Sequence, residues 1–397
     1  MRVLITYLLS LCSMVVFAQQ PDGILLKTRA LMDQRNYNEA IENMQHIAKK
    51  NTMVYMWLGD CNYGKQDYSN AIRYYLKADS LDKDVASFEL SRCYALKQDT
   101  HNATLWLQRH LALTHKRTEL EIISDTAFIR LSKTKGWDVI WKQNWYSDME
   151  TSRNAIAALI EKGKALDALT ELERLSNKFT PKHEYFSLSA KAYLKQNLLE
   201  PALVFINEAI TLYGRSDEYF FLRADVLFKT GKYTNALEDI TKAIRLNLYI
   251  PSYYLKRAEI ARFAGNNELA ASDLKIYHEL YPESPEAYHQ LGLLENANGH
   301  YLNALDYYDK LIDKDQGKSQ YFIERGNNAL AANQIENADE DYSMALDLNP
   351  NLQDAYLLKG NTRNMLQDTQ GACFNWKMAK QLGSAEAAKL IYENCKE

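Results

Sequence analysis

The stretch Gly231-Lys232-Tyr233-Thr234-Asn235-Ala236-Leu237 recurs further along the chain as Gly299-His300-Tyr301-Leu302-Asn303-Ala304-Leu305. The alanine of this stretch belongs to a column that repeats every 34 residues, at Ala168, Ala202, Ala236, Ala270, Ala304, Ala338 and Ala372. A fixed period of this length indicates an array of repeated supersecondary units.

Three further columns keep the same phase. Twelve residues before each alanine except the first lies a small residue: Ala190, Ala224, Ala258, Gly292, Gly326 and Gly360. Aromatic residues lie four positions earlier again, at Phe186, Phe220, Tyr254, Tyr288, Phe322 and Tyr356. Gly or Asn lies five residues before the first six alanines, at Gly163, Asn197, Gly231, Gly265, Gly299 and Asn333.

Each column has a mechanical reason. Gly and Asn tolerate a positive φ, so their column predicts the tight turn that ends the first helix of each unit. Small residues let two helices cross closely, and the aromatic residues fill the space between neighbouring hairpins. Pro282 and Pro350 each follow an alanine of the column by twelve residues, where the second helix should end. We therefore expect an all-α chain of helix-turn-helix units, each covered by its neighbours.

Looser copies of the motif precede this region. They are Asn36-Tyr37-Asn38-Glu39-Ala40, Asp67-Tyr68-Ser69-Asn70-Ala71 and the segment 97–103, which closely copies 65–71. The spacings of their alanines are 31 and 32 residues, so these units are shorter at their joints. The sequence predicts about ten units, three before residue 117 and seven after residue 150.

The composition excludes some function classes. The chain has 397 residues and a formal net charge of −4, with acidic and basic residues interspersed. Binding of phosphate backbones needs clustered Lys and Arg, so nucleic acid is not an expected partner. The sequence contains no Gly-rich phosphate loop, GxSxG elbow or HExxH motif. We expect no catalytic site, cofactor, metal or small-molecule substrate.

Residues 1–18 differ from the rest of the chain. A short positive start at Met1-Arg2 precedes an apolar run from Val3 to Phe17 and the small residue Ala18. This run is shorter than the roughly 20 residues that a membrane-spanning helix needs. We expect a signal peptide cleaved near Ala18, so that the mature chain begins at Gln19 and is periplasmic or secreted. An uncleaved anchor is the alternative.

The combined pattern resembles the tetratricopeptide repeat (TPR) of exported bacterial proteins. The resemblance implies a right-handed superhelical solenoid, with a concave groove that is lined by the first helix of each unit and binds proteins. We expect an N-terminal array over 19–116, a Trp-rich helical insertion over 117–150, a C-terminal array over 151–384 and a capping helix over 385–397.

The expected groove residues form a mixed polar and aromatic strip suited to a peptide or a helix. They are Phe221, Asp225, Phe228, Lys229, Glu259, Phe263, His289, Asn327 and Asn361. Chaperone-binding members of the family hold a C-terminal carboxylate with an Asn and Lys/Arg clamp. Asn327 and Asn361 match one element of that clamp, but Ile323 and Leu357 stand in place of its lysines, so we do not expect it here.

An Arg–Asp pairing recurs between units. Arg223, Arg257 and Arg325 share one repeat position, and the same units carry Asp239, Asp273 and Asp341 sixteen residues later. Units that lack the Arg also lack the Asp. We interpret the pairs as buried or half-buried ion pairs that join the two helices of a hairpin; a charged ligand site is the alternative.

The insertion has two interpretations. Trp137, Trp141 and Trp145 recur at a helical spacing, which predicts one stripe on one helix. The stripe either covers the joint between the two arrays or docks a partner, since Trp is favoured in binding hot spots. If it docks a partner, Trp141→Ala should abolish binding without lowering the melting temperature.

Loss of the signal peptide leaves four cysteines, an even number that is compatible with disulfides in an exported protein. Cys373 and Cys395 could join the capping helix to the preceding helix, and such an ending is similar to that of many exported TPR proteins. Cys61 and Cys93 occupy equivalent positions in adjacent units. Stacked hairpins lie about 8–10 Å apart, too far for a relaxed disulfide, so we expect buried thiols there.

These features together predict a non-enzymatic scaffold or adaptor that binds other proteins of the bacterial cell envelope. Contact with the membrane would then be indirect, through those partners. Two alternatives remain open at this stage. The solenoid either associates with itself as a structural element or serves as the framework of a cell-envelope or glycan-processing enzyme complex.

Overall fold

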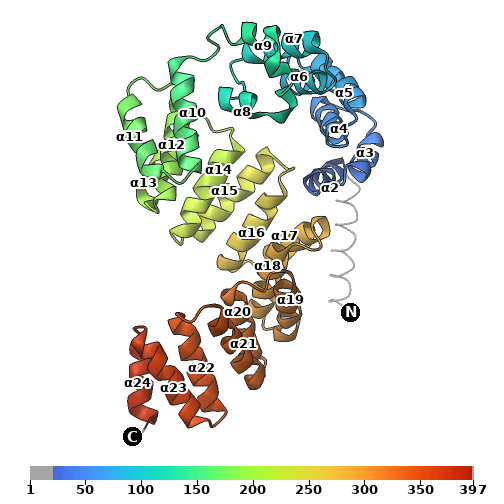
Figure 1. The fold of residues 1–397 in the computed structure, drawn as a ribbon. Helices are drawn as coiled ribbons and strands as arrows, with labels where there is room; N and C mark the ends of the chain where they lie inside the picture. Colours follow the sequence, from blue (N-terminus) through green and yellow to red (C-terminus); the bar gives the residue numbers. More distant parts are fainter. Residues whose placement is uncertain (1–20, 396–397) are drawn as a thin grey trace. The chain divides into compact units, whose positions relative to one another are not determined.

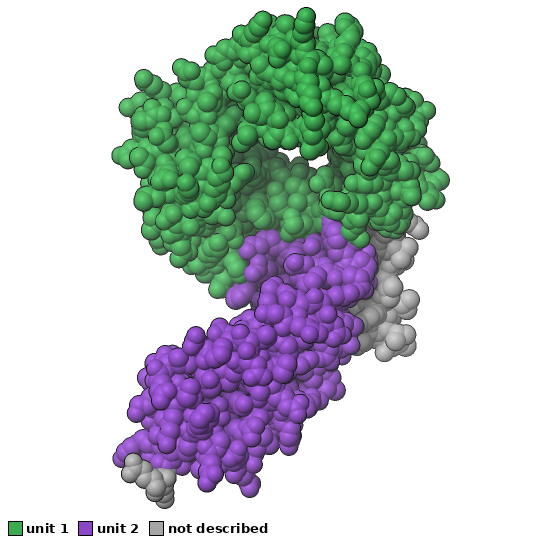
Figure 2. Space-filling model, in the orientation of Figure 1, with its two compact units in different colours: residues 1–253 green, residues 254–397 purple. Residues whose placement is uncertain are grey.

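The computed structural model describes residues 21–395, and in that range it contains α-helices and two short 3-10 turns but no β-strand. The expected signal peptide lies outside the described residues. The helices are labelled in Figure 1. The chain divides into two compact units, residues 1–253 and 254–397 (Figure 2), and the boundary falls inside helix α16 (Pro251–Phe263). None of the described helices is long and apolar enough to cross a membrane.

Unit 1 begins with three hairpins and continues, after the insertion, with three more. The first three are formed by α2 (Pro21–Asp33), α3 (Tyr37–Gln45), α4 (Thr52–Gly64), α5 (Tyr68–Leu81), α6 (Ser87–Leu96) and α7 (Thr100–Leu111). The next three are formed by α10 (Asp148–Glu161), α11 (Ala165–Leu175), α12 (Lys182–Lys195), α13 (Leu199–Leu212), α14 (Asp217–Lys229) and α15 (Tyr233–Leu246).

Unit 2 continues the same alternation. Helix α16 (Pro251–Phe263) crosses the boundary and pairs with α17 (Asn267–Leu280) through the ion pair between Arg257 and Asp273. The remaining helices are α18 (Pro285–Ala297), α19 (Tyr301–Lys314), α20 (Ser319–Ala331), α21 (Ile335–Leu348), α22 (Gln353–Met365), α23 (Thr369–Gln381) and the cap α24 (Ala385–Asn394). The structure thus has ten hairpins between residues 21 and 381, which agrees with the expected number of units.

The turn column has the backbone conformation that its residues predict. Gly163, Gly231, Gly265, Gly299, Asn197 and Asn333 all have a positive φ, between 56° and 78°. The same conformation occurs at this position in the N-terminal hairpins and before Ala372, where Arg35, Gln66, Gln98 and Gln367 have φ values of 60–63°. Stacking of the hairpins therefore imposes the left-handed turn even where the residue type does not favour it.

The small-residue column is explained by the helix crossing. The seven alanines of the 34-residue column are all fully buried. At Gly326 and Gly360 an added Cβ would lie 2.8 Å from the Tyr342 ring and 2.4 Å from the Trp376 ring. The units with Gly thus carry an aromatic ring sixteen residues later, whereas Ala224 and Ala258 precede Ile240 and Leu274 at that spacing. Each hairpin fits one small residue against one large one.

The insertion is a compact segment of short helical elements. It comprises α8 (Glu119–Ser124), the 3-10 turns η1 (Thr126–Phe128) and η2 (Leu131–Lys133), and α9 (Lys135–Ile140). Their apolar side chains form one cluster with the third hairpin, built from Phe88, Ala95, Ala103, Leu107, Leu111, Ile122, Phe128, Leu131, Trp137, Ile140 and Tyr146. The insertion therefore extends the core of the N-terminal hairpins.

The predicted single helical stripe of tryptophans is wrong. Helix α9 ends at Ile140, so it contains Trp137 but neither Trp141 nor Trp145. The indole N–H of Trp145 donates to the carbonyl of Ile140 at 2.8 Å, which turns the chain back on itself. Ser147 then starts α10 with a capping box.

Unit 1 also has a contact between parts that are distant in sequence. The Tyr249 ring, in the turn before α16, packs edge-to-face on Trp57 of α4 with the ring centroids 5.8 Å apart. Tyr249 thereby joins the apolar cluster of the first two hairpins. Figure 2 shows that unit 1 curves round an opening.

Candidate binding groove

The first helices of three consecutive hairpins in unit 1 enclose a hollow of ≈ 370 Å³. Its lining combines apolar and charged side chains from α10, α12 and α14: Ala157, Ile160, Glu161, Leu188, Lys191, Leu194, Lys195 and Leu222. Ile160 and Leu222 are buried, so the hollow has a fixed apolar floor. Its position on the first helices is the one that the family resemblance implies for a groove.

Six of the eight lining residues, all except Leu188 and Leu222, occupy repeat positions that the sequence singled out one or two units further on. Lys191 and Lys195 lie 34 residues before the expected groove residues Asp225 and Lys229. None of the hollow's lining residues was predicted. The 34-residue register applied to α10 and α12 is the signal that could have found six of them, but not Leu188 or Leu222.

Lys191 of the hollow and Lys229 of the expected groove each pair with a carboxylate. Lys191 forms an ion pair with Glu218 of the next unit, and Lys229 lies 3.2 Å from Asp225 within α14. Exposed paired charges contribute little energy, so we expect the apolar floor to contribute most to binding in this hollow.

Two expected groove residues of unit 1 take part in packing. The Phe221 ring stacks on Tyr253 with the centroids 4.9 Å apart and the planes 19° apart. Phe228 packs on Tyr233 at a centroid distance of 5.7 Å. Both rings contact elements further along the chain, so their removal would disturb the structure as well as any groove.

Three expected groove residues of unit 2 interact with neighbouring side chains. The Glu259 carboxylate lies 2.9 Å from the Lys256 ammonium. The Phe263 ring is 45% exposed and carries the Arg262 guanidinium above it at 4.5 Å. His289 Nε2 lies 2.7 Å from Glu324 Oε2 of the following unit.

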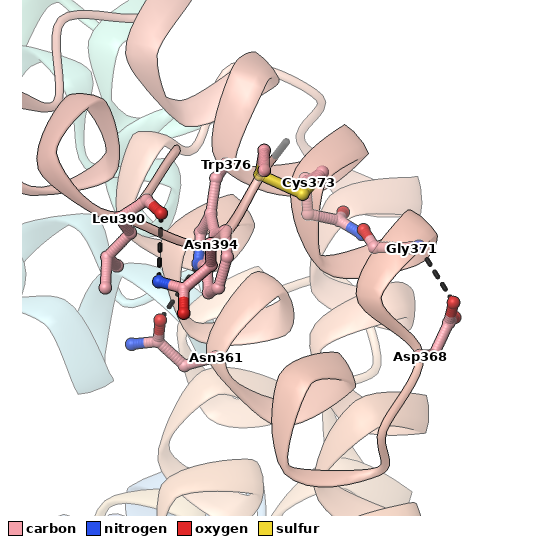
Figure 3. Close-up of a disulfide and its surroundings, with 9 residues drawn as sticks. Asn361, Asp368, Gly371, Cys373, Trp376, Leu390 and Asn394 are labelled. Carbon is pink, nitrogen blue, oxygen red and sulfur yellow. Dashed lines mark hydrogen bonds between the residues drawn. A yellow bond between two sulfur atoms is a disulfide. The ribbon is translucent and has the colours of Figure 1, made fainter. Parts of the chain in front are cut away.

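Asn327 and Asn361 have equivalent surroundings. The Tyr342 hydroxyl donates to Asn327 Oδ1 at 2.8 Å, and the Trp376 indole N–H donates to Asn361 Oδ1 at 2.9 Å (Figure 3). In the N-terminal array the Tyr75 hydroxyl donates to Asp60 in the same way, at 2.8 Å. The oxygen at this position serves the buried aromatic ring fifteen residues later, a role that the sequence interpretation did not assign.

The Arg–Asp pairs join the two helices of their hairpins. The shortest nitrogen–oxygen distances are 2.6 Å for Arg223–Asp239, 2.7 Å for Arg257–Asp273 and 2.6 Å for Arg325–Asp341. The aspartates are buried and the arginines half-buried. Burial alone would lower the pKa of Arg257, but its hydrogen bonds to the Asp273 carboxylate outweigh burial and raise that pKa, so the guanidinium stays charged.

The sequence interpretation missed a second acceptor on two of these arginines. Arg223 also donates to Asn207 at 2.9 Å, and Arg325 also donates to Asp309 at 2.7 Å. Both acceptors lie sixteen residues before the arginine, in the preceding unit. A polar residue at that position was the available signal. Each of these arginines therefore links two hairpins as well as two helices.

The tryptophans of the insertion are packed. Trp137 is buried, and the half-buried Trp141 and Trp145 lie against the same cluster. The rings of Trp137 and Trp141 meet edge-to-face with their centroids 5.6 Å apart. Their contacts are with Phe128 and the third hairpin, the arrangement that a covering segment would make.

The four cysteines that follow the expected signal peptide fall into two classes. Cys373 of α23 and Cys395, directly after α24, form a disulfide with their Cα atoms 5.8 Å apart (Figure 3). Cys61 and Cys93 are buried free thiols, and burial raises the pKa of each to about 12. Among residues 21–395, no group of His, Cys, Asp and Glu is arranged to hold a metal ion.

The stack of helical hairpins, each covered by its neighbours, defines an α-solenoid of repeated units. Sequence models described as tetratricopeptide repeat match residues 25–85, 255–319 and 217–248. The chain therefore contains tetratricopeptide repeats in these segments. No curated protein matches it.

Two solved structures share the fold. A tetratricopeptide repeat protein from Parabacteroides merdae is 17% identical and has a TM-score of 0.52, covering 62% of this chain and 99% of its own. The Cut9–Hcn1 hetero-tetramer of the APC/C contains a chain that is 14% identical with a TM-score of 0.53, covering 92% of this chain and 82% of its own. Both likenesses show the fold alone.

Proposed function

We propose that this protein is a non-enzymatic scaffold or adaptor of the bacterial cell envelope that binds a segment of a partner protein in the groove of its first helices. The observation that carries the proposal is the hollow of ≈ 370 Å³ between α10, α12 and α14. Its apolar floor is formed by Ile160, Leu188, Leu194 and Leu222. A concave apolar floor with a charged rim is suited to an extended or helical peptide.

Two further points support the proposal. Repeat solenoids present extended surfaces that bind proteins, and the chain's pattern offers no catalytic motif. The envelope assignment depends on the N-terminal sequence, where residues 1–18 have the pattern of a signal peptide. The Cut9–Hcn1 hetero-tetramer is an example of a protein of this fold in a complex with a second protein.

The test is a pull-down from detergent-solubilised cell envelope with the tagged chain from Gln19 onward. We expect one stoichiometric partner that is lost with Leu188→Arg, because the substitution places a charge on the half-buried apolar floor. Val204→Arg is the matched control, since Val204 is 61% exposed on the second helix α13.

Thermal melting must give the same midpoint for both variants and the parent chain. A partner that Leu188→Arg retains would place binding on another surface. Self-association without a partner would favour the alternative of a structural solenoid. An enzyme among the bound proteins would favour the role of a framework for a cell-envelope or glycan-processing complex.

A further inference from the structure

A second hollow, of ≈ 510 Å³, lies between the insertion and the second array of unit 1. It is bordered by α8 and α10 and shares Ala157 and Glu161 with the groove described above. The regular repeat does not form it, because α8 belongs to the insertion. We call it the α8–α10 hollow; it is lined by Thr118, Glu119, Leu120, Glu121, Ile123, Tyr146, Thr151, Asn154, Ala155, Ala157, Ala158 and Glu161.

The apolar part of this hollow comes from two helices with different side chains. On α8, Ile122 is fully buried in the core, whereas Leu120 is 64% exposed and Ile123 is 54% exposed. On α10 the lining includes the small side chains of Ala155, Ala157 and Ala158, beside polar side chains. Large aliphatic side chains beside alanines form a site into which the side chains of another segment can insert.

The position of α8 is fixed by polar contacts on both sides of the hollow. Thr118 and Glu121 form a capping box at the start of α8. The Tyr146 hydroxyl donates to the Arg117 carbonyl at 2.7 Å, and the Lys116 ammonium lies 2.8 Å from the Glu150 carboxylate of α10. The hollow is therefore formed before any ligand arrives, which lowers the entropy cost of binding.

The charge of the lining is of one sign. Three glutamates, Glu119, Glu121 and Glu161, are exposed at the hollow, and none of its lining residues is Lys or Arg. Glu121 is paired with Arg117 at 3.4 Å, so the negative charge offered to a ligand comes from Glu119 and Glu161. Like charges around an apolar floor repel acidic segments and attract basic ones. The chemistry of the occupant follows: aliphatic side chains to cover Leu120 and Ile123, and cationic side chains to face the glutamates.

We propose that the α8–α10 hollow binds a partner-protein segment that carries aliphatic side chains flanked by Lys or Arg. The inference extends the proposed function, because it names the chemistry of the segment that reaches the groove through Ala157 and Glu161. It also gives the insertion a binding role through the exposed side chains of Leu120 and Ile123.

The probe is a phage-displayed library of random peptides, selected on the chain from Gln19 onward. We expect enriched peptides with two or more aliphatic residues beside Lys or Arg. A fluorescent copy of one such peptide is then titrated by anisotropy. The double substitution Glu119→Lys and Glu161→Lys should weaken its binding at least tenfold, and so should Ile123→Arg alone.

The matched control is Glu200→Lys with Glu208→Lys, which makes the same charge change at exposed positions of α13 and should leave the dissociation constant unchanged. Added salt should weaken binding of the peptide to the parent chain, because exposed charges are screened within about 10 Å at 0.1 M salt. Circular dichroism checks that each variant remains folded.

The outcomes separate the two proposals. If Leu188→Arg blocks binding of the selected peptides but Ile123→Arg and the double glutamate variant do not, the proposed function stands and this inference is overturned. Enrichment of acidic peptides would overturn it as well, as would self-association that Ile123→Arg abolishes, since the occupant would then be a second copy. A library that yields no binder would count against both proposals.

Discussion

At the scale of single residues, His110 has the most unusual surroundings of the histidines. Its side chain is buried, and the backbone N–H of Arg117 donates to Nε2 at 2.8 Å while Ser87 Oγ lies 3.4 Å from Nδ1. The proton is therefore assigned to Nδ1. Burial, with a smaller contribution from the cationic Arg117 and Lys116, lowers the pKa of His110 to about 4.

This shift predicts a pH dependence of stability. In the unfolded chain the pKa returns to about 6.5, so the unfolded state binds more protons as the pH falls from about 6.5 to about 4. Above about pH 6.5 the neutral His110 makes its full contribution to the free energy of unfolding. That contribution, about 3 kcal/mol, is lost as the pH falls from about 6.5 to about 4. His110→Gln should remove this part of the pH dependence.

The measurement is urea unfolding at pH 7 and pH 4.5, followed by Trp fluorescence, which reports mainly on unit 1 because Trp57, Trp106, Trp137, Trp141 and Trp145 lie there. The exposed His115→Gln is the control and should leave the pH dependence unchanged. Equal losses of stability for the His110 variant and the parent chain would contradict the prediction.

At the scale of helical elements, the pairing of one small residue with one large one sets the distance between two helices. An added Cβ at Gly360 of α22 would lie 2.4 Å from the Trp376 ring of α23. At Gly292 of α18 the nearest ring atoms, those of Tyr308, are 3.1 Å away. Both glycines lie inside helices, where alanine is favoured by roughly 1 kcal/mol.

The two Gly→Ala variants should therefore differ. Gly360→Ala overpacks its hairpin and should destabilise the protein by about 1–3 kcal/mol. In Gly292→Ala the smaller overlap is offset by helix propensity, so its stability should change by less than about 1 kcal/mol. Thermal melting of both variants is the measurement; equal midpoints, or a larger loss at Gly292, would show that ring clearance does not set the helix distance.

At the scale of the whole molecule, the array has ends that need cover, and the C-terminal end is held by α24 and the disulfide between Cys373 and Cys395. In a solenoid each unit contacts mainly its neighbours, so the loss of a terminal contact spreads only over the nearest units. We expect Cys395→Ser to destabilise the end of unit 2 by about 2–4 kcal/mol.

Hydrogen exchange measures this effect with resolution along the chain. Amides of α22, α23 and α24 should exchange faster in Cys395→Ser, whereas those of α2 to α7 should be unchanged. Reduction of the parent chain should reproduce the pattern. Cys61→Ser, which replaces a buried free thiol, is the control and should change exchange in unit 1 only. Faster exchange throughout both units would mean that the chain unfolds as one cooperative body.

The sequence by itself determined the repeating part of this protein. The columns of Ala, Gly or Asn, and aromatic residues each report a contact within one hairpin or with the next one. Such contacts recur at a fixed spacing and can be read from one chain. The Arg–Asp pairs followed from the same periodicity, and each lies within bonding distance across its hairpin.

The tertiary structure alone decided what the period does not govern. The path of residues 117–147 depends on single contacts, such as the hydrogen bond from the Trp145 indole to the Ile140 carbonyl. These contacts do not recur along the chain, so the repeat pattern does not predict them. The exposure of Leu120 and Ile123 beside the alanines of α10 likewise follows from how the insertion folds back on unit 1. Local periodicity encodes each hairpin, whereas a surface between non-repeating elements exists only once the chain has packed.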